Sequence, residues 1–462
     1  MSQQEFPVAP KLRQLLGPSF IILALGLGSG EVILWPYLTA NYGLGLAWGA
    51  LVGITFQFFI NLEIERYALV RGESVFVGIF KFFRLAPYWF ILSTFIGFGL
   101  PGIIAASAQV ISVLFGWESF KWLAIAMLVV IGIILTVGKT IYGLMEKLTK
   151  TVIMIGVPVI FILAIVFSSP DSWQALASGI IGKGEGFWFL APGMALATFM
   201  AAFAYSGAGG NLNLTQSIYV KEKGYGMGKY SQKIAGLFAS GGHQEVRLSG
   251  ENFVINDSSI KRFQSWWRAI NLEHLLVFWL IGSLSMLLLM FLAYNTTFGH
   301  PGNASGINFV ITEGKVIGEL LHSWVGSVFL VIVGVMLFQT QLGIMDSTSR
   351  IMAENAALEK IKHSGNSRVN LSSIYYIFVW SQIAFGITLF LLDIYEPKSL
   401  IVLGALINAL AMLIHVVLVT ILNHRYLEKP FQPAPWRRYI IYLIIAFFTF
   451  FSGVVIWDQL LR

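Results

Sequence analysis

The sequence predicts an all-α polytopic membrane protein with eleven transmembrane helices, arranged as two inverted five-helix repeats and one further helix. Three observations predict it. Of the 462 residues, 56% are hydrophobic and only 11% are charged, and the mean hydropathy is +0.75. The charges lie between apolar runs of about 20 residues, the length that crosses a bilayer core. Two glycine clusters interrupt apolar runs at matching places. A soluble domain, with roughly a quarter of its residues charged, is excluded.

Each apolar run is expected to be a helix, because a helix satisfies its own backbone inside lipid. The expected spans are 18–41, 45–66, 87–115, 120–138, 146–168, 192–220, 272–294, 325–348, 372–393, 398–422 and 437–457. The expected divisions are an N-terminus (1–16), repeat one (17–168), an outer loop (169–191), repeat two (192–422) with a hydrophilic insert (221–271), and the region of the eleventh helix (423–462). The insert is expected to be an ordered cytoplasmic loop, with Trp266 and Trp267 at the membrane interface.

The positive charges predict the orientation. With the N-terminus inside, 25 of the 30 Lys and Arg residues fall on the inner side. The five outer ones are Lys121, Lys183, Lys315, Lys398 and Arg462. This bias predicts a cytoplasmic N-terminus and an outer C-terminus, and we expect a multi-pass protein of a prokaryotic plasma membrane. It also accounts for the net charge of +7 without nucleic acid as a partner. The lipid bilayer is the expected partner, and the lack of cysteine excludes disulfides and thiolate metal sites.

Two glycine clusters lie in long apolar runs, residues 26–31 (GLGSGE) in the first span and 205–211 (YSGAGGN) in the sixth. Each glycine costs a helix roughly 1 kcal/mol relative to alanine. Interrupted spans in matching positions of two halves indicate inverted repeats around a binding site at mid-membrane. The alternative is that the glycines allow close helix packing. The matched positions favour broken helices.

Glu31 is the charged residue of the first cluster and lies in the middle of a predicted span. A charge at this depth costs at least roughly 2.5–3.5 kcal/mol, so it usually faces a cavity and has a function there. We interpret Glu31 as the ligand of a cation or a proton; the alternative is a protonated carboxyl bonded to backbone. Asn211 and Asn213 follow the second cluster and offer neutral oxygens.

No motif predicts an enzyme or a cofactor. After Gly26 and Gly28, the third glycine of a dinucleotide fingerprint would fall on Glu31, and the context is a membrane helix instead of a strand–turn–helix unit. We therefore expect neither catalysis nor a bound cofactor.

Several segments resemble the Nramp family of divalent-metal transporters, which share the LeuT-like fold of the APC superfamily. The matching segments are 17–20 (GPSF), 42–43 (YG), 66–72, 142–147 (YGLMEK), 211–217, Gln339 and Glu354. The similarity spans most of residues 15–425 at low identity. It implies a transporter that works by alternating access, with broken helices one and six.

The departures from the family pattern lie at the motifs that bind metal. The Asp-Pro-Gly-Asn motif of segment one reads Gly28-Ser29-Gly30-Glu31, and Met-Pro-His of segment six reads Ala208-Gly209-Gly210. A second histidine position reads Thr215, and the acid of segment three reads Gln109. The resemblance therefore implies a transporter without the usual proton relay.

These changes leave two substrate classes open. Loss of the thioether with one carboxylate retained favours a hard, partly hydrated divalent cation such as magnesium or manganese. Alternatively, Gly28-Ser29-Gly30 is similar to the Gly-Ser-Gly of amino-acid transporters in the superfamily. There, main-chain N–H groups at a half-helix N-terminus hold a carboxylate, and Glu31 would meet the ammonium group of a small organic solute.

A possible coupling-ion site is Asp346-Ser347-Thr348 in the eighth span, by analogy with sodium-coupled relatives. The alternative is that Asp346 pairs with Arg350 or Lys360. The predicted substrate site comprises Glu31, Gly28, Ser29, Gly30, Ala208, Gly209, Asn211 and Asn213, with Glu31 as the metal ligand if the substrate is a metal. A channel or a non-transporting sensor on the same scaffold is the different class that stays open.

Overall fold

The computed structural model is helical, as the composition predicts, and it describes residues 4–10, 15, 18–26, 28–137, 141–231, 246–364 and 368–461. The α-helices are α1 Pro18–Gly26, α2 Trp35–Tyr42, α3 Ala47–Arg71, α4 Val75–Phe80, α5 Ala86–Gly99, α6 Gly102–Leu114, α7 Lys121–Val137, α8 Ile141–Val166, α9 Pro170–Ile180, α10 Leu196–Ala204, α11 Thr215–Lys223, α12 Asp257–His274, α13 Gly282–Thr297, α14 Asn308–Leu320, α15 Ser323–Ser364, α16 Leu371–Leu391, α17 Pro397–Tyr426 and α18 Pro435–Leu461. Two π-helical turns, η2 Gly30–Leu34 and η6 Leu275–Ile281, and the 3₁₀ turns η3 Leu44–Leu46, η4 Gly210–Leu214, η5 Gly226–Tyr230 and η7 Lys429–Phe431 lie between them. The strands β1 Val246–Arg247 and β2 Arg368–Val369 pair antiparallel.

Within the described residues, eight helical stretches are long and apolar enough to cross a membrane, and a ninth is counted if the bent pair Lys150–Val166 and Pro170–Ile180 forms one span. This differs from the eleven predicted spans for physical reasons. The sixth predicted span is divided into α10 and α11, of nine residues each. The fourth, α7, has 17 residues. The bend of 118° occurs where Ser169 and Ser172 form a capping box, which starts a new helix.

Helix α12 corrects the predicted start of the seventh span and part of the predicted loop 221–271. A capping box between Asn256 and Ser259 begins the helix, which continues through η6 and α13 as one run, Asp257–Thr297. Trp266 is 3% exposed and donates its Nε1–H to the carbonyl of Pro7 at 3.0 Å. Trp266 is therefore buried against the N-terminal segment.

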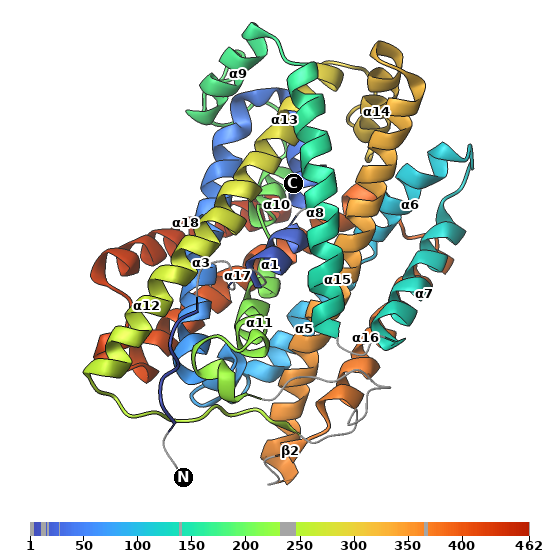
Figure 1. Ribbon diagram of the computed structural model, residues 1–462. Coiled ribbons are helices and arrows are strands. Elements are labelled where there is room, and N and C mark those ends of the chain that lie inside the picture. The colour runs from blue at the N-terminus through green and yellow to red at the C-terminus, as the bar shows by residue number, and fades with distance from the viewer. Residues whose placement is uncertain are drawn as a thin grey trace.

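Helix α15 is the central element of the molecule. It packs against α5, α6, α14 and α16 and runs from the end that carries α14 to the end that carries β2 (Figure 1). The predicted span ended at residue 348, whereas the helix continues to Ser364. Its polar turns after Met345 stay helical because buried ion pairs satisfy them, as described below.

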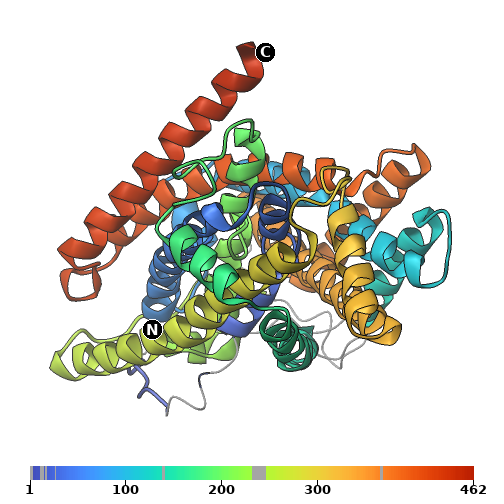
Figure 2. The same ribbon diagram turned by 90° about the horizontal axis from the view of Figure 1, so that it is seen from above.

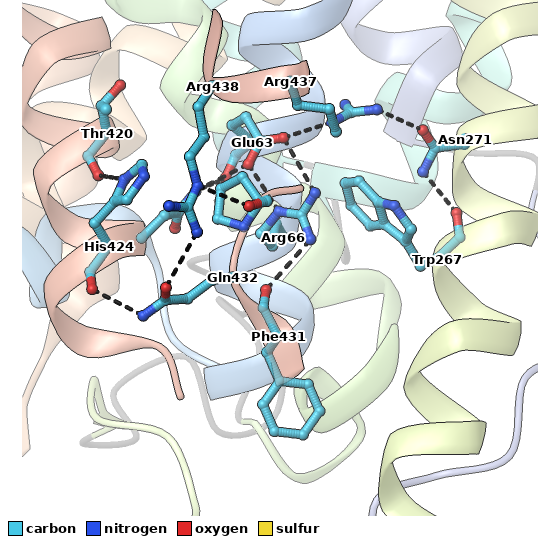
Figure 3. A network of polar contacts seen from close by, with 12 residues as sticks. Glu63, Arg66, Trp267, Asn271, Thr420, His424, Phe431, Gln432, Arg437 and Arg438 are labelled. Carbon is cyan, nitrogen blue, oxygen red and sulfur yellow. Dashed lines mark hydrogen bonds and ion pairs between the residues drawn. The ribbon is translucent and has the colours of Figure 1, made fainter. Parts of the chain in front are cut away.

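Helix α18 lies along the outside of the bundle (Figure 2). Only 17% of its most apolar stretch is buried inside the protein. Arg437 at its start fastens it to α3. The Nε of Arg437 donates to Oε1 of Glu63 at 2.8 Å, and Arg66 donates to Oε2 of the same carboxylate at 2.7 Å. Both guanidinium groups lie over the ring of Trp267, so one buried cluster joins α3, α12 and α18 (Figure 3).

Candidate functional site

The first helix break follows α1. The helix ends at Gly26, whose carbonyl accepts a hydrogen bond from the Gly28 N–H at 2.7 Å. The chain resumes as η2 at Gly30. Thr340 of α15 donates its hydroxyl to the carbonyl of Ala24 at 3.1 Å, and its side chain fills the space in which a Gly28 Cβ would lie. A helix that stops here frees carbonyl groups, and Thr340 satisfies one of them.

The second break lies between α10 and η4. Gly207, Gly209 and Gly210 have φ values of 116°, 71° and 51°, which favour glycine because other residues are strained there. The side chain of Gln57 on α3 satisfies backbone groups on both sides of this break. Its Nε2 donates to the carbonyl of Ala204 at 2.9 Å, and its Oε1 accepts from the Gly209 N–H at 3.0 Å.

The two breaks touch each other through their backbones. A Cβ on Gly26 would lie 2.6 Å from the Cα of Gly207, and a Cβ on Gly30 would overlap the carbonyl oxygen of Tyr205. Trp35 also donates its Nε1–H to the Ser206 hydroxyl at 2.9 Å. Both interpretations of the glycine clusters therefore apply. The glycines break the helices, and they also let the broken segments pack closely.

Glu31 is fully buried in η2. Neither of its carboxyl oxygens has a hydrogen-bond partner in the described part of the chain. The carboxyl points toward α13, because a Cβ on Gly282 would lie 3.8 Å from its Oε1 and next to Leu23 and Ile54. The alternative of a carboxyl bonded to backbone is not what the structure shows. An unpartnered buried carboxyl is costly unless a proton or a cation accompanies it.

Asn211 and Asn213 point away from Glu31, toward other helices. The amide of Asn211 donates to the hydroxyls of Ser93 and Thr94 on α5, at 2.8 and 3.0 Å. The amide of Asn213 approaches the sulfur of Met412 on α17 at 3.3 Å. Both carbonyl oxygens have no partner among the described residues. The predicted site residues therefore form two groups, Glu31 on the α13 side and the asparagines on the α5 and α17 side, with the glycine backbone between them.

The other predicted positions lie in this glycine backbone. Ser29 and Ala208 are each 2% exposed, and Ser29 forms no capping bond with its side chain. The Ser29 carbonyl accepts from the Leu34 N–H at 3.0 Å. Of the predicted residues, Gly28, Ser29, Gly30, Ala208 and Gly209 thus contribute main-chain groups and space.

A small cavity lies beside the second break, between α5, α15 and α17. Phe98 and Tyr205 line it with stacked rings 6.1 Å apart, and Gln341 and Ile344 line it from α15. The hydroxyl of Tyr205 accepts a hydrogen bond from the amide of Asn408 at 2.8 Å. The cavity has aromatic and amide groups in its lining, but its volume is about 10 Å³, which is room for a single water molecule.

The predicted coupling-ion residues take part in a buried ion-pair network. Asp346 accepts from the Nε of Arg350 at 2.9 Å and from the hydroxyl of Tyr375 at 2.8 Å. Arg350 donates its Nη1 to Glu222 of α11 at 2.6 Å. Asp346 and Arg350 are 0% and 1% exposed. This is the pairing with Arg350 that the sequence left as the alternative, and it leaves Asp346 fully engaged.

Ser347 and Thr348 also connect α15 to neighbouring helices. The Ser347 hydroxyl donates to the carbonyl of Gly343 at 2.8 Å and lies 2.6 Å from the hydroxyl of Tyr219 on α11. Thr348 donates to Gln382 of α16 at 2.8 Å. The triplet therefore joins α15 to α11 and α16 and does not face the first break.

Sequence reasoning missed Gln57, Thr340 and Asn408. Each satisfies backbone freed at a break or a ring hydroxyl beside it. The available signal was a polar side chain inside an apolar run, which in lipid needs a partner. Among the described residues, no three His, Cys, Asp or Glu side chains come together to hold a metal ion. Within the described part of the two breaks, residues 28–34 and 205–214, Glu31 is the one charged group.

Comparison with known proteins shows the fold. No family model and no curated protein matches the sequence. The crystal structure of a mutant of the Eremococcus coleocola manganese transporter is similar to this chain, at 14% sequence identity and a TM-score of 0.71. The similarity covers 99% of this chain and 90% of the transporter chain. In complex with an aromatic bis-isothiourea substituted compound, the same transporter matches at a TM-score of 0.70. The structure of MhsT in complex with L-phenylalanine matches 98% of this chain and 99% of that chain, at 12% identity and a TM-score of 0.54. The chain shares their LeuT-like fold.

Proposed function

We propose that this protein is an Nramp-like secondary transporter that moves a small substrate across the membrane by alternating access between broken spans one and six. One observation carries the proposal: two helices break where their backbones touch, and the fully buried Glu31 beside this contact has no partner among the described residues. Broken spans that meet at mid-membrane are the usual substrate site of such folds. The proposal includes the eleven spans, the inverted repeats and a cytoplasmic N-terminus.

The first substrate we propose is a hard divalent cation that keeps part of its water, such as magnesium or manganese. Glu31 is the single charged ligand, and main-chain carbonyls freed at the breaks are the neutral ones. The described residues offer no cluster of three acidic or histidine ligands, so remaining positions fall to water, as magnesium accepts. The fold shared with a manganese transporter supports this choice.

The second candidate is an amino acid or a similar small organic solute. The lining of the cavity beside the second break supports it, because Phe98 and Tyr205 offer apolar ring faces and Gln341 offers an amide. At about 10 Å³ the cavity is closed to such a solute, so this candidate requires the breaks to separate during the transport cycle. In this case the Gly28–Gly30 backbone meets a carboxylate of the solute and Glu31 meets its ammonium group. The fold shared with a transporter that binds phenylalanine supports it. Sodium coupling through Asp346 is not part of the proposal, because Arg350 pairs with this carboxylate.

The deciding experiment is a thermal-shift and calorimetric panel on the purified protein. Magnesium, manganese, calcium and a set of amino acids are tested against the wild type, Glu31→Gln and the control Glu118→Gln, which changes an exposed carboxylate. A ligand at 100 times its dissociation constant stabilises the folded state by about 2.7 kcal/mol. We expect a divalent ion to stabilise the wild type and the control but not Glu31→Gln.

Other outcomes separate the alternatives. Stabilisation by an amino acid alone rejects the metal and supports the organic solute. Binding without uptake into proteoliposomes supports a sensor, and flux that does not saturate supports a channel. If Glu31→Gln binds every ligand as the wild type does, the site between the breaks is wrong.

A further inference from the structure

Helix α3 presents a row of polar side chains to the broken helices. Gln57, Asn61 and Glu65 are four residues apart, so they lie along one face of the helix. Each is at most 1% exposed. The row starts at the second break, where Gln57 bonds the backbone, and ends at Glu65. A buried polar row inside a membrane bundle is costly and indicates a function.

Glu65 meets Gln216 of α11, the helix that follows the second break. The Nε2 of Gln216 donates a hydrogen bond to Oε1 of Glu65. Two atoms of this pair are left without a partner among the described residues, Oε2 of Glu65 and Oε1 of Gln216. A carboxylate offers only acceptors, and so does an amide oxygen. A carboxylic acid instead pairs with a primary amide through two hydrogen bonds, and a proton on Glu65 would supply the second bond, from the carboxylic acid to the amide oxygen.

The surroundings make an ionised Glu65 unfavourable. Glu273 of α12 lies within electrostatic range of Glu65, and two neighbouring carboxylates oppose each other's ionisation. His274 lies beside Glu273, and both contact the Ser19 hydroxyl of α1, with 2.9 Å between Ser19 Oγ and His274 Nδ1. Arg437 acts on His274 from α18. Among the described charged groups, Glu273 thus acts on Glu65 directly, with His274 next to it in the chain and Arg437 acting on His274.

We propose that Glu65 is a proton-binding site in which the carboxylic acid and the amide of Gln216 form a two-bond pair, and that this proton joins α3 to α11. The ligand is a proton. Loss of the proton leaves a buried carboxylate facing an amide oxygen, which drives α11 away from α3 and opens the molecule at the end that the charge distribution predicts to be cytoplasmic. The inference that the molecule opens rests on the proposed function. The inference that Glu65 binds a proton does not depend on it.

Infrared spectroscopy tests the proton directly. The spectrum of the wild type at neutral pH is compared with that of Glu65→Gln, a near-isosteric change that preserves pairing with Gln216. We expect the variant to lose the band of a protonated carboxylic acid. The exposed control Glu118→Gln is expected to lose only a carboxylate band. In Gln216→Leu the Glu65 band is expected at higher frequency, because its hydrogen bonds are gone. Loss of only a carboxylate band in Glu65→Gln overturns the proposal.

A thiol reporter tests the opening. The chain has no cysteine, so Ile22→Cys in α1, a fully buried position, gives a single site for a membrane-impermeant thiol reagent. Because the thiolate is the reactive form, its modification rate is divided by that of a free thiol with the same reagent at each pH. We expect this ratio to rise by up to about tenfold per pH unit, as for release of one proton on opening, and to stay low at all pH values when Glu65→Gln is added. Equal pH dependence with and without Glu65→Gln overturns the opening step. Neither measurement uses a transported solute, so a failed uptake assay counts against the proposed function alone.

Discussion

Gly30 of the first helix break lies against the main-chain carbonyl of Tyr205 in the second, so closely that a Cβ on Gly30 would overlap this oxygen. The two residues are far apart in the sequence, and the contact requires residue 30 to have no side chain, because the Tyr205 carbonyl occupies that space. The closeness of the breaks, which the proposed function needs, therefore depends on single glycines.

The substitution Gly30→Ala tests this contact. Overpacking in a tight site typically costs about 1–3 kcal/mol, and here the obstacle is backbone, which moves little. We expect a lower melting temperature in detergent and loss of any substrate stabilisation. The control is Gly453→Ala in α18, where a Cβ meets nothing within 4 Å. Equal melting temperatures for the two variants would show that the breaks are not in contact.

Gln57→Leu tests whether the side chain of Gln57 stabilises the second break through its hydrogen bonds to the backbone. The variant removes the donor to Ala204 and the acceptor for Gly209, and each backbone group left unsatisfied costs about 1–3 kcal/mol. We expect the free energy of unfolding to fall by about 2–6 kcal/mol in total. Gln109→Leu, at a half-buried position on α6, is the comparison and is expected to have a smaller effect. A neutral Gln57→Leu contradicts the bridging role.

Arg437→Met tests the attachment of α18. Glu63 and Arg437 are 6% and 5% exposed, and leaving a buried charge unpaired typically costs about 3–5 kcal/mol; because Arg66 still pairs with Glu63, we expect a cost below that range. We expect earlier unfolding and faster proteolysis near α18. Lys121→Met breaks the pair with Asp393, which is 70% exposed, and such a pair contributes about 0–1 kcal/mol. Similar effects of the two substitutions would show that the buried ion-pair cluster in Figure 3 does not hold α18 in place.

Glu313 on α14 predicts a pH dependence of stability. Burial raises the pKa of this carboxyl from its ordinary value of 4.5 to about 8, with a weak opposing bond from Thr296. Between these values the folded state holds a proton that the unfolded state has released, so stability is full below the lower value and is lost as the pH rises to about 8. The shift corresponds to roughly 3–5 kcal/mol.

Melting temperature measured across this window checks the sign. We expect Glu313→Gln to remove most of the decline, because its amide carries no proton to lose. The exposed Glu319→Gln on the same helix is expected to keep the decline of the wild type. A wild-type melting temperature that rises across the window would contradict the burial of a protonated Glu313.

Much of the fold was readable from local patterns. The apolar runs predicted membrane helices, and the clusters at 26–31 and 205–211 predicted interruptions that occur where expected. Glu31, predicted to lie in the middle of a span, is fully buried. Each depends on the composition of a short segment. The prediction placed the end of the eighth span at residue 348, and α15 continues as a helix to Ser364, where the pairs of Arg350 with Asp346 and Glu222 satisfy its buried charges.

The sequence by itself determined that this chain is a membrane protein, where its helices break, and which acid lies at a break, because hydrophobicity and glycine content act over a few neighbouring residues. Only the tertiary structure decided which groups meet: Gly30 with Tyr205, Gln57 with Gly209, and Glu65 with Gln216. These partners are distant in sequence, and the packing of α3 against both halves of the broken helices brings them together. A hydrogen bond depends on the position of both atoms, and a linear pattern specifies at most one of them.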